Sequence, residues 1–252
     1  MNSLTQMHSI TLACALALVP AALSAEEGHH WGYDAEHGPK HWAEMNPEYE
    51  SCGVGKAQSP IDIRGAVPAK LDAIEFDYHP TPLHIIDNGH TVQVNYEPGS
   101  SISVGGKRYE LQQFHFHRPS EEKVNGKNYP MVAHLVHKDS DGAIAVVAVL
   151  LKEGAQNPLV KTLWTDLPKE KEKERVEEKV KINAASLLPQ SHKYYTFDGS
   201  LTTPPCSEGV TWFVLTTPKQ ISKEQVARFS KIYNGNARPT QPLNGRTIKV
   251  SQ

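Results

Sequence analysis

The sequence lacks the features that mark several large classes of protein. Lys and Arg number 26 against 28 Asp and Glu, for a formal net charge of −2, so there is no basic surplus of the kind that binds nucleic acid. It has no Gly-x-Ser-x-Gly motif, no Walker-type phosphate loop and no Cys-x-x-Cys pair, so nothing supports those enzyme classes. The 252 residues contain no internal repeat or low-complexity linker, which indicates one globular domain with a sizeable core.

Long hydrophobic runs are missing too. Residues 1–25 contain no Asp, Glu, Lys or Arg, and the apolar run at residues 10–23 is too short to span a bilayer comfortably. This segment is typical of a secretory signal peptide, although its first residues lack the usual Lys or Arg. We therefore expect cleavage after Ser24 or Ala25, a mature domain at residues 26–252, a periplasmic or secreted location and no stable membrane anchor.

Cysteine is scarce. Cys14 lies within the expected signal peptide and would leave with it, so Cys52 and Cys206 are the cysteines of the mature chain. In an oxidising compartment two cysteines are more often paired than free, and the alternative is two separate buried thiols. In the chain-entropy model, a bridge over so long a loop stabilises the fold by about 4 to 5 kcal/mol.

Histidines, in contrast, recur in strand-like segments. His115 and His117 alternate with Phe114 and Phe116. Because side chains two apart on a strand share a face, the two histidines project together while the two phenylalanines turn to the buried side.

A third histidine completes this set. His134 follows a turn-like segment that contains Pro119 and Asn125-Gly126, and a hairpin there brings it alongside His115 and His117. Three neutral imidazoles with an open fourth position are the ligands of a catalytic zinc, whereas structural zinc is more often closed by cysteines. The alternative is a set of surface or hydrogen-bonded histidines.

The rest of the chain is rich in strand signals. Short candidates punctuated by Asn-Gly, Pro-Gly and Gly-Gly pairs precede the histidines, and two nearly unbroken apolar runs typical of buried strands follow them. The predicted strands lie at residues 85–86, 91–96, 101–104, 144–151 and 210–216.

Two segments favour helices. Alternating Lys and Glu in residues 167–181 indicate a solvated helical face with ion pairs one turn apart. Ser222 and Gln225 form a capping box that starts a second helix, and Asn234-Gly235 is its predicted stop.

The start of the mature chain, residues 26–42, is rich in His, Trp and Gly. Two interpretations stay open for it. One is a second metal site, and the other, which we prefer, is the aromatic packing of an N-terminal arm.

Several motifs in one order give the chain a family resemblance. The histidine segments at residues 113–117 and 133–137 are followed by Ser-Leu-Thr-Thr-Pro-Pro at residues 200–205. Together with the flanking motifs from His30-Trp31-Gly32-Tyr33 to Gln241-Pro242-Leu243, they make nearly the whole mature chain resemble an alpha-class carbonic anhydrase of the exported bacterial type. The resemblance implies an α+β, mainly β, single domain with a largely antiparallel twisted central sheet of about ten strands and peripheral helices.

The resemblance also implies roles for individual residues. Zinc on His115, His117 and His134 would carry the hydroxide that attacks carbon dioxide, with Thr202 and Glu121 orienting that hydroxide and His90 shuttling the proton to solvent. Carbonic anhydrase is itself a standard case of this zinc chemistry. The resemblance implies a substrate pocket lined by Val136, Val146, Leu201, Thr203 and Trp212. The residues that would organise proton-path waters are Tyr33, Asn88 and Gln93.

One position departs from the family pattern. The family usually has Glu two residues before its third histidine ligand, where it accepts that ligand's other ring N–H, but here the residue is Val132. We hypothesise that His134 uses water or a backbone carbonyl instead, which would weaken zinc binding. Gln113 and the Asn236 backbone are the partners expected for His115 and His117.

The sequence thus predicts a zinc enzyme, a carbonic anhydrase, that interconverts carbon dioxide and bicarbonate. The cofactor is Zn²⁺, although the ligand type does not exclude cobalt or iron. The partners are small-molecule substrates and no nucleic acid, and a homodimer stays open. The competing functions are a noncatalytic zinc-binding or ligand-binding protein on the same scaffold and a metallohydrolase of esters.

Overall fold

The computed structural model describes residues 30–252. The expected signal peptide at residues 1–25, its cleavage site and Cys14 lie outside the described residues. Within the described part of the chain, no helix combines the length and apolar character needed to cross a bilayer.

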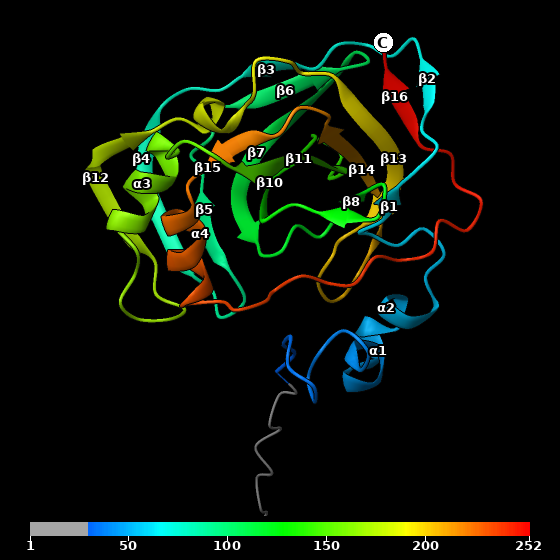
Figure 1. Ribbon diagram of the computed structural model, residues 1–252, viewed down its shortest axis with the longest axis horizontal. Coiled ribbons are helices and arrows are strands. Elements are labelled where there is room, and N and C mark those ends of the chain that lie inside the picture. Colours follow the sequence, from blue (N-terminus) through cyan, green and yellow to red (C-terminus); the bar gives the residue numbers. More distant parts are fainter. Residues whose placement is uncertain (1–29) are drawn as a thin grey trace, which may run out of the picture.

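A mixed sheet of 13 strands forms the framework of the molecule (Figure 1). Its main path runs β12-β4-β5-β7-β10-β11-β14-β13-β16-β2, with β15 beside β11, and with β6 joining β3 to β7. A small second sheet has the order β1-β8-β9. The strands are β1 (Asp62–Ile63), β2 (Val67–Ala69), β3 (Glu75–Asp77), β4 (Thr81–Asp87), β5 (Val92–Asn95), β6 (Ser101–Val104), β7 (Lys107–His117), β8 (Lys123–Val124), β9 (Lys127–Asn128), β10 (Met131–Lys138), β11 (Ile144–Glu153), β12 (Arg175–Ile182), β13 (Tyr194–Ser200), β14 (Glu208–Leu215), β15 (Lys219–Ile221) and β16 (Lys249–Ser251).

Helices are few and short. They are α1 (Trp42–Met45), α2 (Ser51–Val54), α3 (Pro158–Thr165) and α4 (Lys223–Ser230), with the 3₁₀ turns η1 (Pro47–Tyr49) and η2 (Ala184–Leu187). In Figure 1 α1 and α2 lie at one edge of the molecule, near its N-terminal arm, and α3 and α4 lie together beside the sheet. This is the predicted mainly β fold with peripheral helices, and the sheet is largely antiparallel as expected, apart from the parallel pairs β11–β14, β11–β15 and β16–β2.

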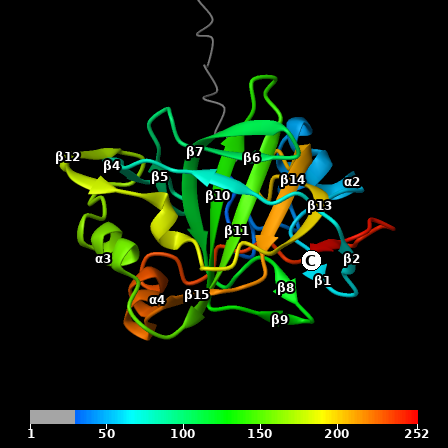
Figure 2. The same cartoon turned by 90° about the horizontal axis from the view of Figure 1, so that it is seen from above.

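The centre of the sheet aligns the histidine strands. Strands β7 and β10 are antiparallel, and their register places His134 directly opposite His115. Figure 2 shows β7, β10, β11 and β14 side by side in the middle of the molecule. The predicted hairpin is therefore confirmed, and its connection contains the turn at Asn125 and Gly126, where both residues have positive φ.

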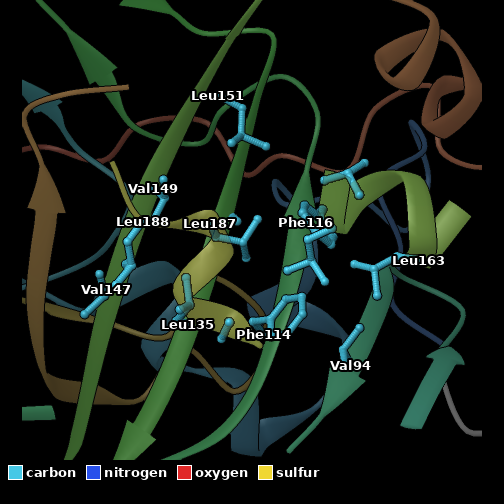
Figure 3. Close-up of a cluster of buried hydrophobic side chains, with 14 of the residues drawn as sticks. Val94, Phe114, Phe116, Leu135, Val147, Val149, Leu151, Leu163, Leu187 and Leu188 are labelled. Atoms are coloured by element: carbon cyan, nitrogen blue, oxygen red, sulfur yellow. The ribbon is translucent and has the colours of Figure 1, made fainter. Parts of the chain in front are cut away.

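The two faces of this sheet bury different apolar clusters. On the face away from the histidines, Phe114, Phe116 and Leu135 are fully buried and pack beneath α3 and η2, as Leu163 and Leu187 in Figure 3 illustrate. The histidine face carries a smaller cluster that includes Val132, Val146 and Trp212. The period-two alternation of β7 and β10 thus supplies both a core and a site.

The prediction of a helix at residues 167–181 is wrong. Residues 175–182 form strand β12, which is antiparallel to β4 and outermost on the main path of the sheet. Its Lys and Glu side chains are mostly exposed, and charged side chains are a common means of keeping an edge strand from pairing with other chains. Lys and Glu spaced one helical turn apart do not exclude an exposed strand, so the charge pattern alone is ambiguous.

Helix α4 is confirmed at its start only. Ser222 Oγ accepts from the Gln225 N–H and the Gln225 side chain accepts from the Ser222 N–H, which completes the capping box. The helix ends at Ser230, before the predicted stop at Asn234-Gly235.

The N-terminal arm is fixed by aromatic packing, as preferred from the sequence. Trp31, Tyr33 and Trp42 form edge-to-face pairs with one another at centroid distances of 5.3 to 5.8 Å. They pack against a disulfide between Cys52 and Cys206, so the predicted pairing is present. The bridge ties the arm to the turn that follows β13.

Removing this disulfide should cost much of the stability of the fold. The bridge spans 154 residues, and loss of a native bridge over a long loop costs about 2 to 5 kcal/mol. We expect the free energy of unfolding, measured by urea denaturation, to fall by this amount in a Cys52→Ser/Cys206→Ser variant. It should fall by nearly as much in the reduced parent protein. An unchanged urea midpoint in both samples would contradict a stabilising role.

Candidate metal centre

Three histidines from adjacent strands converge on one point. His115 and His117 come from the end of β7, and His134 comes from the middle of β10. One nitrogen from each ring lies within 4.8 Å of those of the other two. Among residues 30–252, this is the only group of three or more His, Cys, Asp or Glu side chains able to share a metal ion.

Each ring is held by a hydrogen bond at one nitrogen. His115 Nδ1 donates to Gln113 Oε1 at 2.8 Å, and His117 Nδ1 donates to the Asn236 carbonyl oxygen at 2.7 Å. These are the two partners expected from the sequence. Asn236 is itself fixed across the end of β7, because its side-chain amide donates to the carbonyl oxygen of Phe116 at 2.9 Å.

The corresponding expectation for His134 is wrong. Its Nε2 donates neither to water nor to a backbone carbonyl but to Glu122 Oε1, at 2.9 Å. Val132, two residues before His134, instead packs in the apolar cluster on the histidine face. The carboxylate missing from β10 is supplied by the loop after β7, which removes the reason for expecting weaker zinc binding. Sequence reasoning missed Glu122, because nothing in the chain order of Glu121-Glu122 says which carboxylate faces a ligand.

The nitrogens left free fit a metal ion. With Nδ1 of His115, Nδ1 of His117 and Nε2 of His134 engaged, the other nitrogen of each ring faces the common centre. His117 Nε2 is buried and has no hydrogen-bond partner among the described residues, which is the condition expected of a nitrogen that binds a metal ion. His115 is the partly exposed member of the group, so the site is reachable from that side. Three imidazole donors with an accessible position are the donor set of a catalytic zinc.

The pKa values of His115 and His117 agree with this assignment. Burial lowers the pKa of His115 to about 3, and the neighbouring His134 adds to the effect. Burial likewise places the pKa of His117 well below its usual value. Both rings are therefore neutral at pH 7, and a neutral imidazole is the form that binds a metal.

Glu121 lies beside the metal-facing nitrogens. Its Oε2 is 3.4 Å from His117 Nε2 and 3.8 Å from His134 Nδ1, while its Oε1 accepts the Arg238 backbone N–H at 2.8 Å. Burial raises the pKa of Glu121 to about 7, although the charge of His134 and the nearby Thr202 side chain act in the opposite direction. Thr202 and Glu121, paired in the sequence analysis, are thus neighbours in the structure.

An apolar surface adjoins the same centre. Val146 and Trp212 are buried on the histidine face, and Val136 and Leu201 pack against them. The Trp212 ring lies edge-on to the His134 ring with centroids 4.9 Å apart. Four of the five predicted pocket residues therefore share one cluster, and the fifth, Thr203, lies in the turn after Thr202, where its carbonyl oxygen accepts the Cys206 N–H.

The predicted proton-path residues Asn88 and Gln93, and the predicted shuttle His90, lie on β5 and in the turn between β4 and β5. Asn88 Nδ2 donates to Gln93 Oε1 at 3.2 Å, and Gln93 is the register partner of His115. His90 stacks on Trp31 with ring centroids 3.5 Å apart and also stacks on His30. Burial lowers the pKa of His90 to about 4 in this arrangement, with the charges of His30 and Lys171 adding to the shift.

Tyr33 completes this set of residues on the other side. Its hydroxyl oxygen is buried without a hydrogen-bond partner among residues 30–252. Burial is the main cause that raises the pKa of Tyr33, and the charge of Glu121 is the second. Tyr33 is thus within electrostatic reach of the Glu121 carboxylate.

Comparisons with known proteins agree with this geometry. A family model described as eukaryotic-type carbonic anhydrase matches residues 37–252. A carbonic anhydrase from Pectobacterium carotovorum is 45% identical over 94% of this chain and 98% of its own length. Among solved structures, a hyperthermostable carbonic anhydrase from a hydrothermal vent chimney is 50% identical with a TM-score of 0.86, covering 88% of this chain and 100% of that one. An alpha carbonic anhydrase from Thermovibrio ammonificans, in complex with sulfanilamide, is 45% identical with a TM-score of 0.84, covering 88% and 99% of the two chains.

Proposed function

Because the chain belongs to the eukaryotic-type, or alpha-class, carbonic anhydrase family, we propose that it interconverts carbon dioxide and bicarbonate with zinc held by His115, His117 and His134. The observation that carries this proposal is the convergence of three buried or partly buried imidazoles, each with its other nitrogen already engaged. Such a set is ready to bind an ion without rearrangement.

His115, His117 and His134 would hold a zinc ion, which would supply Lewis-acid activation of a water molecule at neutral pH. The residues around it would then provide the orientation. Thr202 accepts the proton of the nucleophile in a hydrogen bond and donates its own to Glu121, which points a lone pair at the substrate carbon. The Arg238 N–H, by occupying the other oxygen of Glu121, fixes the direction of that carboxylate.

The apolar cluster gives the substrate its place. Carbon dioxide has no charge and gains from leaving water for an apolar surface. Val136, Val146, Leu201 and Trp212 offer such a surface beside His134, and Thr203 borders it. Bicarbonate, being charged, is poorly accommodated there, which favours its release to solvent.

A proton must reach solvent in every cycle of hydration. We assign its transfer to His90, with Tyr33, Asn88 and Gln93 holding the waters between. Proton transfer at neutral pH is most effective for a group with a pKa near 7, whereas His90 stacked on Trp31 has a pKa of about 4. We therefore expect the ring to work from a more exposed position than the stacked one.

The disulfide and the predicted signal peptide support an exported location. The chain has a disulfide between its two mature cysteines, and disulfides form and persist mainly in oxidising compartments. Together with the predicted signal peptide, this leads us to propose a periplasmic or secreted protein with its domain at residues 26–252.

A stopped-flow assay of carbon dioxide hydration tests the function. We expect mature protein with one equivalent of zinc to catalyse hydration, and His117→Ala to lose both zinc and activity, because that ring supplies a buried ligand. His79→Ala is the matched control, since His79 is exposed and pairs with Asp77; it should keep both. Zinc-loaded parent protein that leaves carbon dioxide unhydrated would refute the proposal.

The shuttle has its own test. His90→Ala should slow turnover in weak buffer by about 100-fold, the lower end of the usual contribution of a general acid or base, and added imidazole should restore part of the rate. The rate in strong buffer should change little, because buffer then carries the proton. Equal rates for His90→Ala and the parent in weak buffer would exclude the role.

A further inference from the structure

Glu122 is a buried carboxylate with a single hydrogen bond. Its exposed fraction is 0%, and Oε1 accepts from His134 Nε2 at 2.9 Å. Its other oxygen, Oε2, is buried and has no hydrogen-bond partner among residues 30–252. Nothing in the chemistry of carbon dioxide hydration requires this residue to contact the substrate.

Such a carboxylate is costly unless a positive charge balances it. Burying an ionised group with few hydrogen bonds is unfavourable, even after the surrounding protein relaxes. His134 connects Glu122 to the metal centre, since its Nε2 donates to the carboxylate and its ring belongs to the three-histidine group whose ligand nitrogens lie within 4.8 Å of one another. A cation at that centre would polarise the imidazole and thereby strengthen its hydrogen bond to Glu122.

We propose that Glu122 is the positioning residue of the zinc ligand His134, and that its carboxylate sets the orientation of that ring and the retention of the ion. This inference rests on the proposed zinc site but not on the reaction carried out there. The loop after β7 would then supply the carboxylate that holds His134, because the nearby position on the strand of His134 is the apolar Val132.

The loop is built to hold this carboxylate still. Ser120 Oγ donates to the Glu122 carbonyl oxygen at 2.7 Å and accepts the Tyr129 N–H at 2.9 Å. The next residue, Lys123, begins β8, and its N–H donates to the Ile61 carbonyl oxygen at 3.2 Å. Glu122 is therefore anchored by backbone contacts on both sides, which limits the positions its carboxylate can take.

Val132 offers the second place from which a carboxylate could reach His134. It lies two residues before His134 on β10, so the two side chains share a face of the sheet. It is fully buried among apolar neighbours that include Ile61 and Leu150. A glutamate moved to this position, with the one at 122 removed, would return a carboxylate to the same ring without adding a buried charge.

Zinc dissociation into excess chelator tests the proposal directly. We expect Glu122→Ala to release zinc about 10- to 100-fold faster than the parent protein, as loss of an outer hydrogen-bond partner does in other zinc sites. Glu122→Gln should be intermediate, because its amide oxygen can still accept from Nε2 but carries no charge. The double variant Glu122→Ala/Val132→Glu should recover a large part of the lost retention.

The control is Lys123→Ala, which changes the next side chain of the same loop but keeps the backbone hydrogen bond to the Ile61 carbonyl oxygen and leaves the carboxylate in place. It should release zinc at nearly the parent rate. If Glu122→Gln, the mildest change, and Glu122→Ala both keep the parent rate, or if Lys123→Ala accelerates release as much as Glu122→Ala does, the proposal is overturned. A double variant no slower than Glu122→Ala would also overturn it.

A second readout follows the ring itself. In zinc-loaded protein with ¹⁵N-labelled histidine, the Nε2–H of His134 should exchange slowly with solvent in the parent and rapidly in Glu122→Ala. Neither measurement uses carbon dioxide. If the protein failed to hydrate carbon dioxide but the zinc-release and exchange results were as expected, the role of Glu122 would still hold. If the protein hydrated carbon dioxide but zinc release and exchange did not depend on Glu122, only the role of Glu122 would be refuted.

Discussion

The structure depends on one arrangement of hydrogen bonds, in which each histidine of the three-histidine group has one ring nitrogen fixed by a different part of the chain. Gln113 comes from the same strand as His115, the Asn236 carbonyl from the segment after α4, and Glu122 from the loop after β7. Because a neutral imidazole donates from one nitrogen and accepts with the other, engaging the outer nitrogen as a donor leaves the inner one as a lone pair. The three bonds therefore choose both the orientation and the tautomer of the ligands before any ion arrives.

The sheet supports this arrangement because the side chains of β7 and β10 alternate between its two faces. Phe114, Phe116 and Leu135 enter a large apolar core, so β7 and β10 are rigid where they carry His115, His117 and His134. On the other face, apolar residues from β10, β11 and β14 lie beside the site. The alternation of a β-strand thus places three imidazoles that suit a metal ion beside an apolar surface.

Much of this could be predicted from the chain because it depends on local periodicity. The alternation of His115 and His117 with Phe114 and Phe116 predicts the ligand face, and the Ser222 capping box predicts the start of α4. The prediction failed where the sequence leaves two structures equally consistent: the Lys and Glu of residues 167–181 suit an exposed strand as well as a helix, and sheet pairing decided between them. It failed also for Glu122, because the contact with His134 joins a loop to a strand and leaves no periodic trace. Val132 indicated that His134 lacks the usual glutamate partner on its own strand, but it did not indicate that Glu122 takes that place.

The central claim is that the outer hydrogen bonds select which nitrogen of each ring holds the ion. A crystal structure of zinc-loaded protein, with the ion located by anomalous scattering at the zinc edge, measures this directly. We predict one ion bound by Nε2 of His115, Nε2 of His117 and Nδ1 of His134, with Glu122 still on Nε2 of His134. An ion bound through Nε2 of His134, or one placed instead beside His30 and His90, would contradict the account.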